Sequence, residues 1–125
     1  MAQDLRYTKE HEWVRVEGDL AIVGITDYAA HQLGDIVFVE LPEVGRSVSQ
    51  FGAVGVIESV KAVSDLFAPI SGEVEDTNSE LAAGPELVNS DPFGKGWMLR
   101  IRMSDATQLE GLLDKDAYEE LTREG

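Results

Sequence analysis

The sequence contains no cysteine, which excludes disulfide bonds, thiolate metal sites and a cysteine nucleophile. Its only histidines, His11 and His31, are separated by predicted strands, so a histidine metal cluster is excluded and we expect no metal site. No apolar run approaches the roughly 18 residues of a membrane-spanning helix, and the first residues lack the apolar core of a signal peptide. We therefore expect a soluble protein of the bacterial cytoplasm, or of the mitochondrial matrix if the chain is a processed eukaryotic form.

Basic residues are also scarce: 10 Lys and Arg stand against 24 Asp and Glu, which gives a formal net charge of -14. Nucleic acids and anionic membrane surfaces are bound mainly through Lys and Arg, so both are excluded as partners. Such acidity favours solubility and attraction to basic protein surfaces. Because 43% of the 125 residues are apolar, we expect one globular domain over residues 1–125.

Short apolar, β-rich segments separated by turn residues make up much of the chain. The predicted strands lie within Asp19–Thr26, Asp35–Leu41, Phe51–Val60, Ala62–Ile70 and Trp97–Met103. Many short strands at short intervals predict a sandwich or a barrel.

Two regions carry helix signals instead. In the first, Thr26 or Asp27 is the predicted N-cap and Gly34 the predicted end. After Ser104 the apolar residues change to a helical spacing, and Asp114 can start a further helix. We predict one short internal helix and two short C-terminal helices over about residues 105–124, packed over the sheets.

Lys61 is the only Lys or Arg between Ser47 and Gly94, and it lies at the predicted turn between two apolar strands. Two-residue hairpin turns usually contain Gly, Asn or Asp, and the segment SVKAV has none of them. A lysine amine on its flexible stem is a common target of acylation. The residues therefore predict a modified lysine on a rigid sheet, with an ordinary exposed turn lysine as the alternative.

Motifs for catalysis by side chains are missing. There is no G-x-S-x-G elbow for a serine hydrolase. The segment FGKG, Phe93–Gly96, differs from a phosphate-binding loop, because Asn89 replaces the upstream glycine and Gly96 the hydroxyl residue. We predict a turn here, and a protein that is not an enzyme.

Four segments, in the expected order, resemble the glycine cleavage system H protein family of lipoyl carriers. They are YTKEHEWV (Tyr7–Val14), GITDYAAHQLGDIVFVELPEVG (Gly24–Gly45), ESVKAVSD (Glu58–Asp65) and VNSDPFGKGWMLRI (Val88–Ile101). The resemblance implies a mainly β fold, a barrel-sandwich hybrid of the lipoyl/biotinyl carrier type with two antiparallel sheets, one short internal helix and short C-terminal helices. Its lipoyl hairpin would cover about residues 52–70, and its first strand would lie in Tyr7–Val14.

The same resemblance implies that Lys61 carries lipoic acid through an amide bond, attached by a lipoate ligase or an octanoyltransferase. The arm would carry an aminomethyl group from a pyridoxal-phosphate glycine decarboxylase (P protein) to a tetrahydrofolate-dependent aminomethyltransferase (T protein). Its reduced dithiol would be reoxidised by dihydrolipoyl dehydrogenase (L protein) with FAD and NAD. The chain would be a non-catalytic, monomeric carrier in glycine catabolism and one-carbon metabolism.

Four further residues receive roles from the resemblance. Glu58 would be read by the lipoylating enzyme, and Gly45 would help to present the hairpin. Glu12 and Asp65 would line a cleft into which the loaded arm folds, where a carboxylate could bind a protonated amine. The alternatives are a solvated edge charge for Glu58 and an ordinary turn glycine for Gly45.

Other functions remain open at this point. The chain could be a lipoyl donor or relay carrier for other 2-oxoacid dehydrogenase complexes, although a lipoyl domain of such a complex would be shorter and would lack the terminal helices. A biotin carrier usually has its lysine between methionines, whereas Val60 and Ala62 flank Lys61. A purely structural β module is the remaining possibility.

Overall fold

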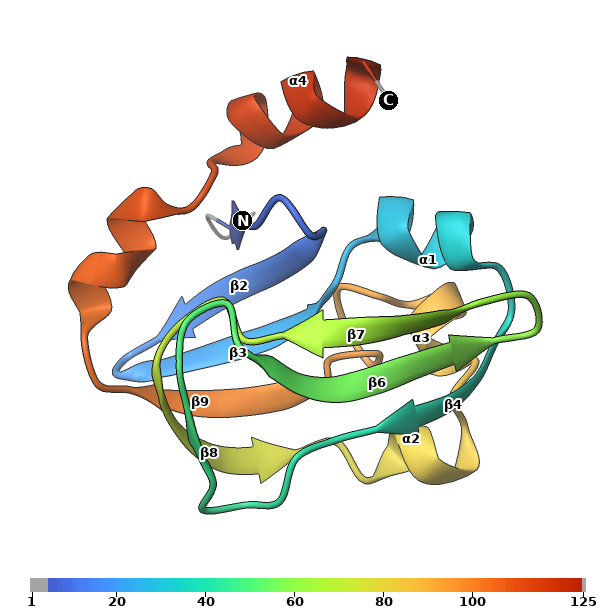
Figure 1. Cartoon of the computed structure of the whole chain (residues 1–125), viewed down its shortest axis with the longest axis horizontal. Coiled ribbons are helices and arrows are strands. Elements are labelled where there is room, and N and C mark those ends of the chain that lie inside the picture. Colours follow the sequence, from blue (N-terminus) through green and yellow to red (C-terminus); the bar gives the residue numbers. More distant parts are fainter. Residues whose placement is uncertain (1–4, 125) are drawn as a thin grey trace.

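The computed structural model describes residues 5–124, which form two antiparallel sheets with short helices at their edges (Figure 1). The six-stranded sheet has the order β1-β2-β3-β9-β8-β5, and the three-stranded sheet the order β4-β6-β7. The strands are β1 (Leu5–Tyr7), β2 (Glu12–Glu17), β3 (Leu20–Ile25), β4 (Ile36–Glu40), β5 (Ser47–Val48), β6 (Ala53–Ser59), β7 (Val63–Phe67), β8 (Gly72–Thr77) and β9 (Leu99–Met103). The predicted fold class is confirmed, and the sheets do not close into a barrel.

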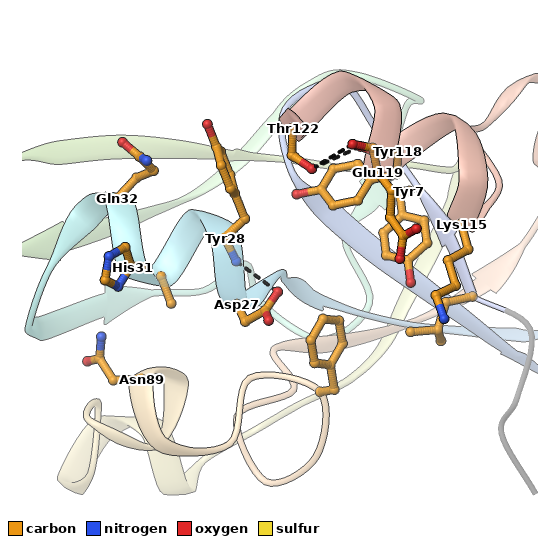
Figure 2. Close-up of a pocket in the computed structure, with 13 residues that line it drawn as sticks. Tyr7, Asp27, Tyr28, His31, Gln32, Asn89, Lys115, Tyr118, Glu119 and Thr122 are labelled. Carbon is orange, nitrogen blue, oxygen red and sulfur yellow. Dashed lines mark hydrogen bonds between the residues drawn. The ribbon is translucent and has the colours of Figure 1, made fainter. Parts of the chain in front are cut away.

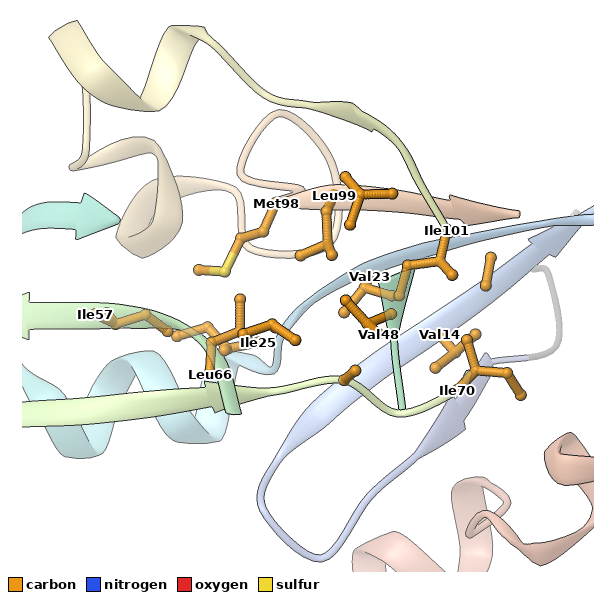
Figure 3. Close-up of a cluster of buried hydrophobic side chains, with 14 of the residues drawn as sticks. Val14, Val23, Ile25, Val48, Ile57, Leu66, Ile70, Met98, Leu99 and Ile101 are labelled. Carbon is orange, nitrogen blue, oxygen red and sulfur yellow. The ribbon is translucent and has the colours of Figure 1, made fainter. Parts of the chain in front are cut away.

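The main hydrophobic core joins the two sheets (Figure 3). Val23 and Ile101 belong to the six-stranded sheet, and Ile57 and Leu66 to the three-stranded one; each is at most 1% exposed. Because inward and outward side chains alternate along a strand, the same strands place polar residues such as Arg102 in solvent.

The internal helix lies where the sequence predicts it. Helix α1 (Asp27–Leu33) begins after Thr26, whose side-chain oxygen accepts a hydrogen bond from the Ala29 N–H at 3.2 Å. It ends at Gly34, whose φ of +84° suits glycine. Both cap predictions follow from local chemistry, which is why the sequence shows them.

The structure also contains elements that the sequence did not predict. Helices α2 (Glu80–Ala83) and α3 (Leu87–Ser90) are single turns of four residues, too short to show a helical spacing of apolar residues. Strand β8 has one fully buried residue, Val74, among acidic ones, and its apolar pattern is therefore weak.

Two expected boundaries are also corrected. Residues Tyr7–Val14 are not one strand, because a turn from Thr8 to His11 separates β1 from β2. The first of the two C-terminal helices is a 3-10 helix, η1 (Ala106–Gly111), which precedes α4 (Lys115–Glu124). Asp114 caps α4 as predicted, accepting a hydrogen bond from the Ala117 N–H.

Asn89 of α3 fixes the connection between α1 and β4. Its Nδ2 donates to the Gly34 carbonyl and its Oδ1 accepts from the Ile36 N–H, both at 2.9 Å. Between these two residues lies Asp35, whose carbonyl accepts a hydrogen bond from the Val60 N–H at 3.1 Å. This connection therefore supports the tip of the β6–β7 hairpin.

We predict that Asn89→Ala lowers the free energy of unfolding by about 1–3 kcal/mol, since two partly buried backbone groups lose their partner. Urea unfolding followed by circular dichroism measures the change. Asn89→Asp keeps the acceptor for Ile36 but places a carboxylate oxygen against the Gly34 carbonyl oxygen, so its loss should be at least as large. An alanine variant as stable as the wild type would contradict this role of Asn89.

Candidate functional site

Lys61 lies at the tip of the hairpin formed by β6 and β7. The last paired residues are Glu58 and Val63, and the Ser59 N–H donates to the Ala62 carbonyl at 2.8 Å. No residue of this tip has a positive φ. The turn therefore does not use the Gly, Asn or Asp chemistry of most two-residue hairpins.

The side chain of Ser59 closes the turn instead. Its Oγ accepts hydrogen bonds from the N–H groups of Lys61, at 3.3 Å, and of Ala62, at 3.0 Å. Ser59 is itself 6% exposed, so this support is protected from water. A serine that binds the backbone of the residues following it is a known turn signal, and it could have been read from the segment ESVKAV.

The side chain of Lys61 is exposed and leaves the tip without a charged partner. It forms no ion pair in the part of the chain that the structure describes. Its stem passes over Gly34, where an added Cβ would lie 3.4 Å from Lys61 Cε. An accessible amine on a fixed backbone fits an acyl group attached through an amide.

Glu58 lies near this tip, and Gly45 does not. Glu58 is exposed on β6, between Phe38 of β4 and Val63 of β7, which are both exposed. Gly45 follows β4 after the end of that strand that points away from the tip, and its N–H donates to the Val74 carbonyl of β8. Its φ of +95° suits glycine, but the structure does not bring it to the lysine.

A groove of about 430 Å³ lies between the β1–β2 turn, the end of β7 and the link from η1 to α4. Its walls are mainly apolar and aromatic. It is lined by Tyr7, Thr8, Lys9, Glu10, Phe51, Phe67, Gly111, Leu112 and Leu113. The resemblance predicted a cleft lined by Glu12 and Asp65, but it did not predict these wall residues, which come from segments that meet only in the fold.

Glu12 lies directly behind two residues of this groove. Its Oε1 accepts a hydrogen bond from Thr8 Oγ1 at 2.6 Å, and its Oε2 accepts one from the Phe67 N–H at 3.1 Å. The side chain is buried, with an exposed fraction of 1%. Asp65, by contrast, is exposed on β7 opposite Val56. Neither predicted cleft residue is a wall of the groove, but Glu12 contacts the wall.

Burial is the main cause that raises the pKa of Glu12 to about 7. The hydrogen bonds from Thr8 and Phe67 lower it, and the charge of Glu10 raises it further. A carboxyl group with a pKa near neutrality can change its charge when a cation approaches.

Two negative findings apply to the described residues alone. No helix among residues 5–124 is long and apolar enough to cross a membrane. No group of three or more His, Asp or Glu side chains in this part of the chain could hold a metal ion.

The fold, with its two sheets and the β6–β7 hairpin (Figure 1), defines a small β protein of the barrel-sandwich hybrid type. Lys61 is presented at the tip of that hairpin. The family model described as glycine cleavage H-protein matches residues 5–125. The chain belongs to this family, and the resemblance found in the sequence is confirmed.

Similar proteins cover almost the whole chain. The glycine cleavage system H protein of Symbiobacterium thermophilum is 57% identical over 122 residues, which cover 98% of this chain and 95% of that protein. The protein of the same name from Magnetococcus marinus is 59% identical, over 93% of this chain and 83% of its own length. A crystal structure of a glycine cleavage system H protein from Mycobacterium marinum matches with a TM-score of 0.87 and 36% identity, covering 98% of this chain and 99% of that one.

The buried carboxyl group leads to a prediction about stability. Because the pKa of Glu12 is raised from 4.5 to about 7 in the folded protein, its contribution is fully present below pH 4.5 and is lost as the pH rises through 7. We expect the free energy of unfolding to fall by about 3 kcal/mol over this range through Glu12 alone.

Urea unfolding of the wild type and of Glu12→Gln at several values between pH 4.5 and pH 8 measures this contribution. In the variant, the free energy of unfolding should lack the part of its pH dependence that Glu12 causes. A constant offset is also expected, because one amide oxygen cannot accept from both Thr8 and Phe67. Identical slopes for the two proteins would show that Glu12 does not bind a proton on folding.

Proposed function

We propose that this protein is the lipoyl carrier of a glycine cleavage system, with lipoic acid joined to Lys61 through an amide. The observation that carries the proposal is an exposed lysine without an ion-pair partner among the described residues, held at the tip of a hairpin in a chain of this family. When attached, the lipoyl group supplies a two-electron dithiol–disulfide couple that carries the aminomethyl group between enzymes.

The chain contributes a fixed base for a mobile arm. The Ser59 hydroxyl accepts hydrogen bonds from the backbone of the turn. The Asp35 carbonyl, in the connection between α1 and β4, accepts one from the Val60 N–H. Beyond these bonds the lysine side chain is exposed, so a group attached to its amine can reach into the active sites of other proteins. A tethered group of this kind acts by raising its effective concentration at each partner.

The proposed partners are the three glycine cleavage enzymes and the enzyme that attaches the lipoyl group. The three glycine cleavage enzymes are the pyridoxal-phosphate glycine decarboxylase, the tetrahydrofolate-dependent aminomethyltransferase and the flavin-dependent dihydrolipoyl dehydrogenase. A net charge of -14 favours approach to basic surfaces on these proteins. Glu58, exposed near the tip, is suited to be read by the attaching enzyme, whereas Gly45 would act at a distance, by shaping the β4–β5 connection.

We propose that the groove beside Glu12 shelters the loaded arm from water. Its apolar walls suit the hydrocarbon part of the arm, and the carboxyl group behind Thr8 and Phe67 suits a protonated amine. A cation in the groove would favour the ionised form of Glu12 and offset the effect of burial on its pKa. Asp65 is exposed on β7, between the hairpin tip and Phe67, and adds negative charge there.

The attachment site is tested by intact mass after incubation with a lipoate ligase, ATP and lipoate. The wild type should gain the mass of one lipoyl group, and Lys61→Arg should gain none, because a guanidinium group cannot form the amide. Lys95→Arg, a change at another exposed lysine, should be modified like the wild type. Modification of the Lys61→Arg chain would refute the assignment, and a biotin-sized increase in a biotinylating system would favour a biotin carrier.

A second prediction concerns the shelter. Glu12→Ala should leave the lipoyl mass increase at Lys61 intact but speed the release of formaldehyde from the loaded carrier by about tenfold, since a hydrogen bond to a charged group contributes roughly 1.5–3 kcal/mol. Glu43→Ala, an exposed change in the β4–β5 connection, is the matched control. Equal release rates from the Glu12→Ala and wild-type carriers would remove Glu12 from the site.

A further inference from the structure

Helix α4 meets the sheets mainly through Tyr118. Its ring stacks on Tyr7 of β1 with centroids 4.5 Å apart and planes 9° from parallel. Both rings border a hollow of about 970 Å³ between α4 and α1, with Tyr28 on the α1 side (Figure 2). Tyr118 is only 6% exposed, and burial raises the pKa of its hydroxyl to about 12, so the hydroxyl keeps its proton.

The hydroxyl group of Tyr118 joins two separate elements. It lies 2.7 Å from Thr26 Oγ1, the N-cap of α1, and 2.9 Å from Nδ1 of His11 in the β1–β2 turn. Thr26 and His11 are also bonded to each other, because the Thr26 N–H donates to the His11 carbonyl at 2.9 Å. One phenol hydroxyl therefore connects α4, α1 and the β1–β2 turn.

His11 is the residue of this turn that most needs outside support. Its φ of +71° is uncommon for a residue other than glycine, and such conformations persist where the surroundings hold them. The His11 N–H donates to the Thr8 carbonyl, and its ring packs against Tyr28 with centroids 4.8 Å apart. The Tyr118 hydroxyl and the His11 ring share a hydrogen bond.

Thr8, at the other end of the same turn, holds the Glu12 carboxyl group. Thr8 Oγ1 accepts hydrogen bonds from the N–H groups of Glu10 and Glu12, and donates its own hydrogen to Glu12 Oε1. The turn is therefore closed by contacts at His11 on one side and around Glu12 on the other.

A second connection runs from α4 to the wall of the groove. Tyr7 and Leu113 exchange two backbone hydrogen bonds, each 2.8 Å long. Leu113 and its neighbour Leu112 line the groove, and α4 begins two residues after Leu113. The placement of α4 thus bears on both the turn that holds Glu12 and the opposite wall.

We propose that Tyr118 is a positioning residue for Glu12: its hydroxyl, through His11, keeps the Thr8–Glu12 turn closed over the carboxyl group and excludes water from it. The value of this arrangement for an arm in the groove rests on the function proposed above. The positioning itself is a property of the unmodified chain.

The charged and titratable groups around this contact are few. Glu10 of the turn acts on both Glu12 and His11, while burial is the main cause that lowers the pKa of His11. Asp27 and the hydroxyls of Tyr28 and Tyr7 act on Tyr118. From β7, the group that faces Glu12 is the uncharged N–H of Phe67.

The test is the titration of Glu12 in the full, unmodified chain, followed by NMR of carbon-13-labelled glutamate carboxyl groups. Tyr118→Phe keeps the stacked ring and removes the hydroxyl. If the turn then admits water, the midpoint of Glu12 should fall by about one pH unit or more, from about 7 toward 4.5. Thr122→Ala is the matched control on the same helix, because among the described residues the Thr122 hydroxyl donates only to the carbonyls of Tyr118 and Glu119, and the Glu12 midpoint should stay unchanged.

A second variant removes the other partner of the same bond. His11→Asn replaces the ring with a residue that tolerates a positive φ, and it should lower the Glu12 midpoint in the same direction. The double variant should shift the midpoint no further than the larger single change, because both act through one contact. Urea unfolding shows which variants remain folded.

An unchanged Glu12 midpoint in folded Tyr118→Phe would overturn the proposal, as would fully additive shifts in the double variant. Both readouts come from a chain with a free Lys61. A failure of lipoylation at Lys61 would therefore refute the carrier function without affecting this result, and the two failures can be told apart.

Discussion

The position of Lys61 depends on the hydroxyl group of Ser59. A hairpin tip without glycine, asparagine or aspartate has no residue suited to a positive φ, and its backbone N–H groups need another acceptor. Ser59 Oγ accepts from two of them and is itself shielded from water. The lysine can thus be exposed while the backbone beneath it is fixed, which is the combination that a tethered carrier group needs.

Support for the tip continues through the neighbouring connection. The Val60 N–H is bonded to the Asp35 carbonyl, and Asn89 holds the residues on both sides of Asp35. Helix α1 ends at Gly34 within this connection, so the lysine stem lies beside the end of a helix that contributes no side chain there. The short helices α1 and α3 therefore help to fix the hairpin, in addition to placing Ala30 and Val88 in the core.

The groove shows a different balance of forces. The chain has 24 acidic residues, most of them in solvent, yet Glu12 is held in the interior at the cost of a raised pKa. Its hydrogen bonds come from a threonine in the β1–β2 turn and from a backbone group of the other sheet. A carboxyl group in this setting is sensitive to small changes in water access, which is why the contact between α4 and His11 matters.

Local chemistry made several features readable in the sequence. Some features depend only on residues that are neighbours in the sequence: the caps of α1, strands β3, β6 and β9, the isolation of Lys61 and the four family segments. These features identified the fold class and the family. The single-turn helices and β8 were not readable, because their residues are placed by packing and not by their own preferences. Likewise, nothing in the order of residues shows that Glu12 meets Phe67, that Tyr118 meets His11, or that Gly45 lies away from the tip. These contacts join residues up to 107 positions apart, and only tertiary structure decides burial, and with it the charge of Glu12.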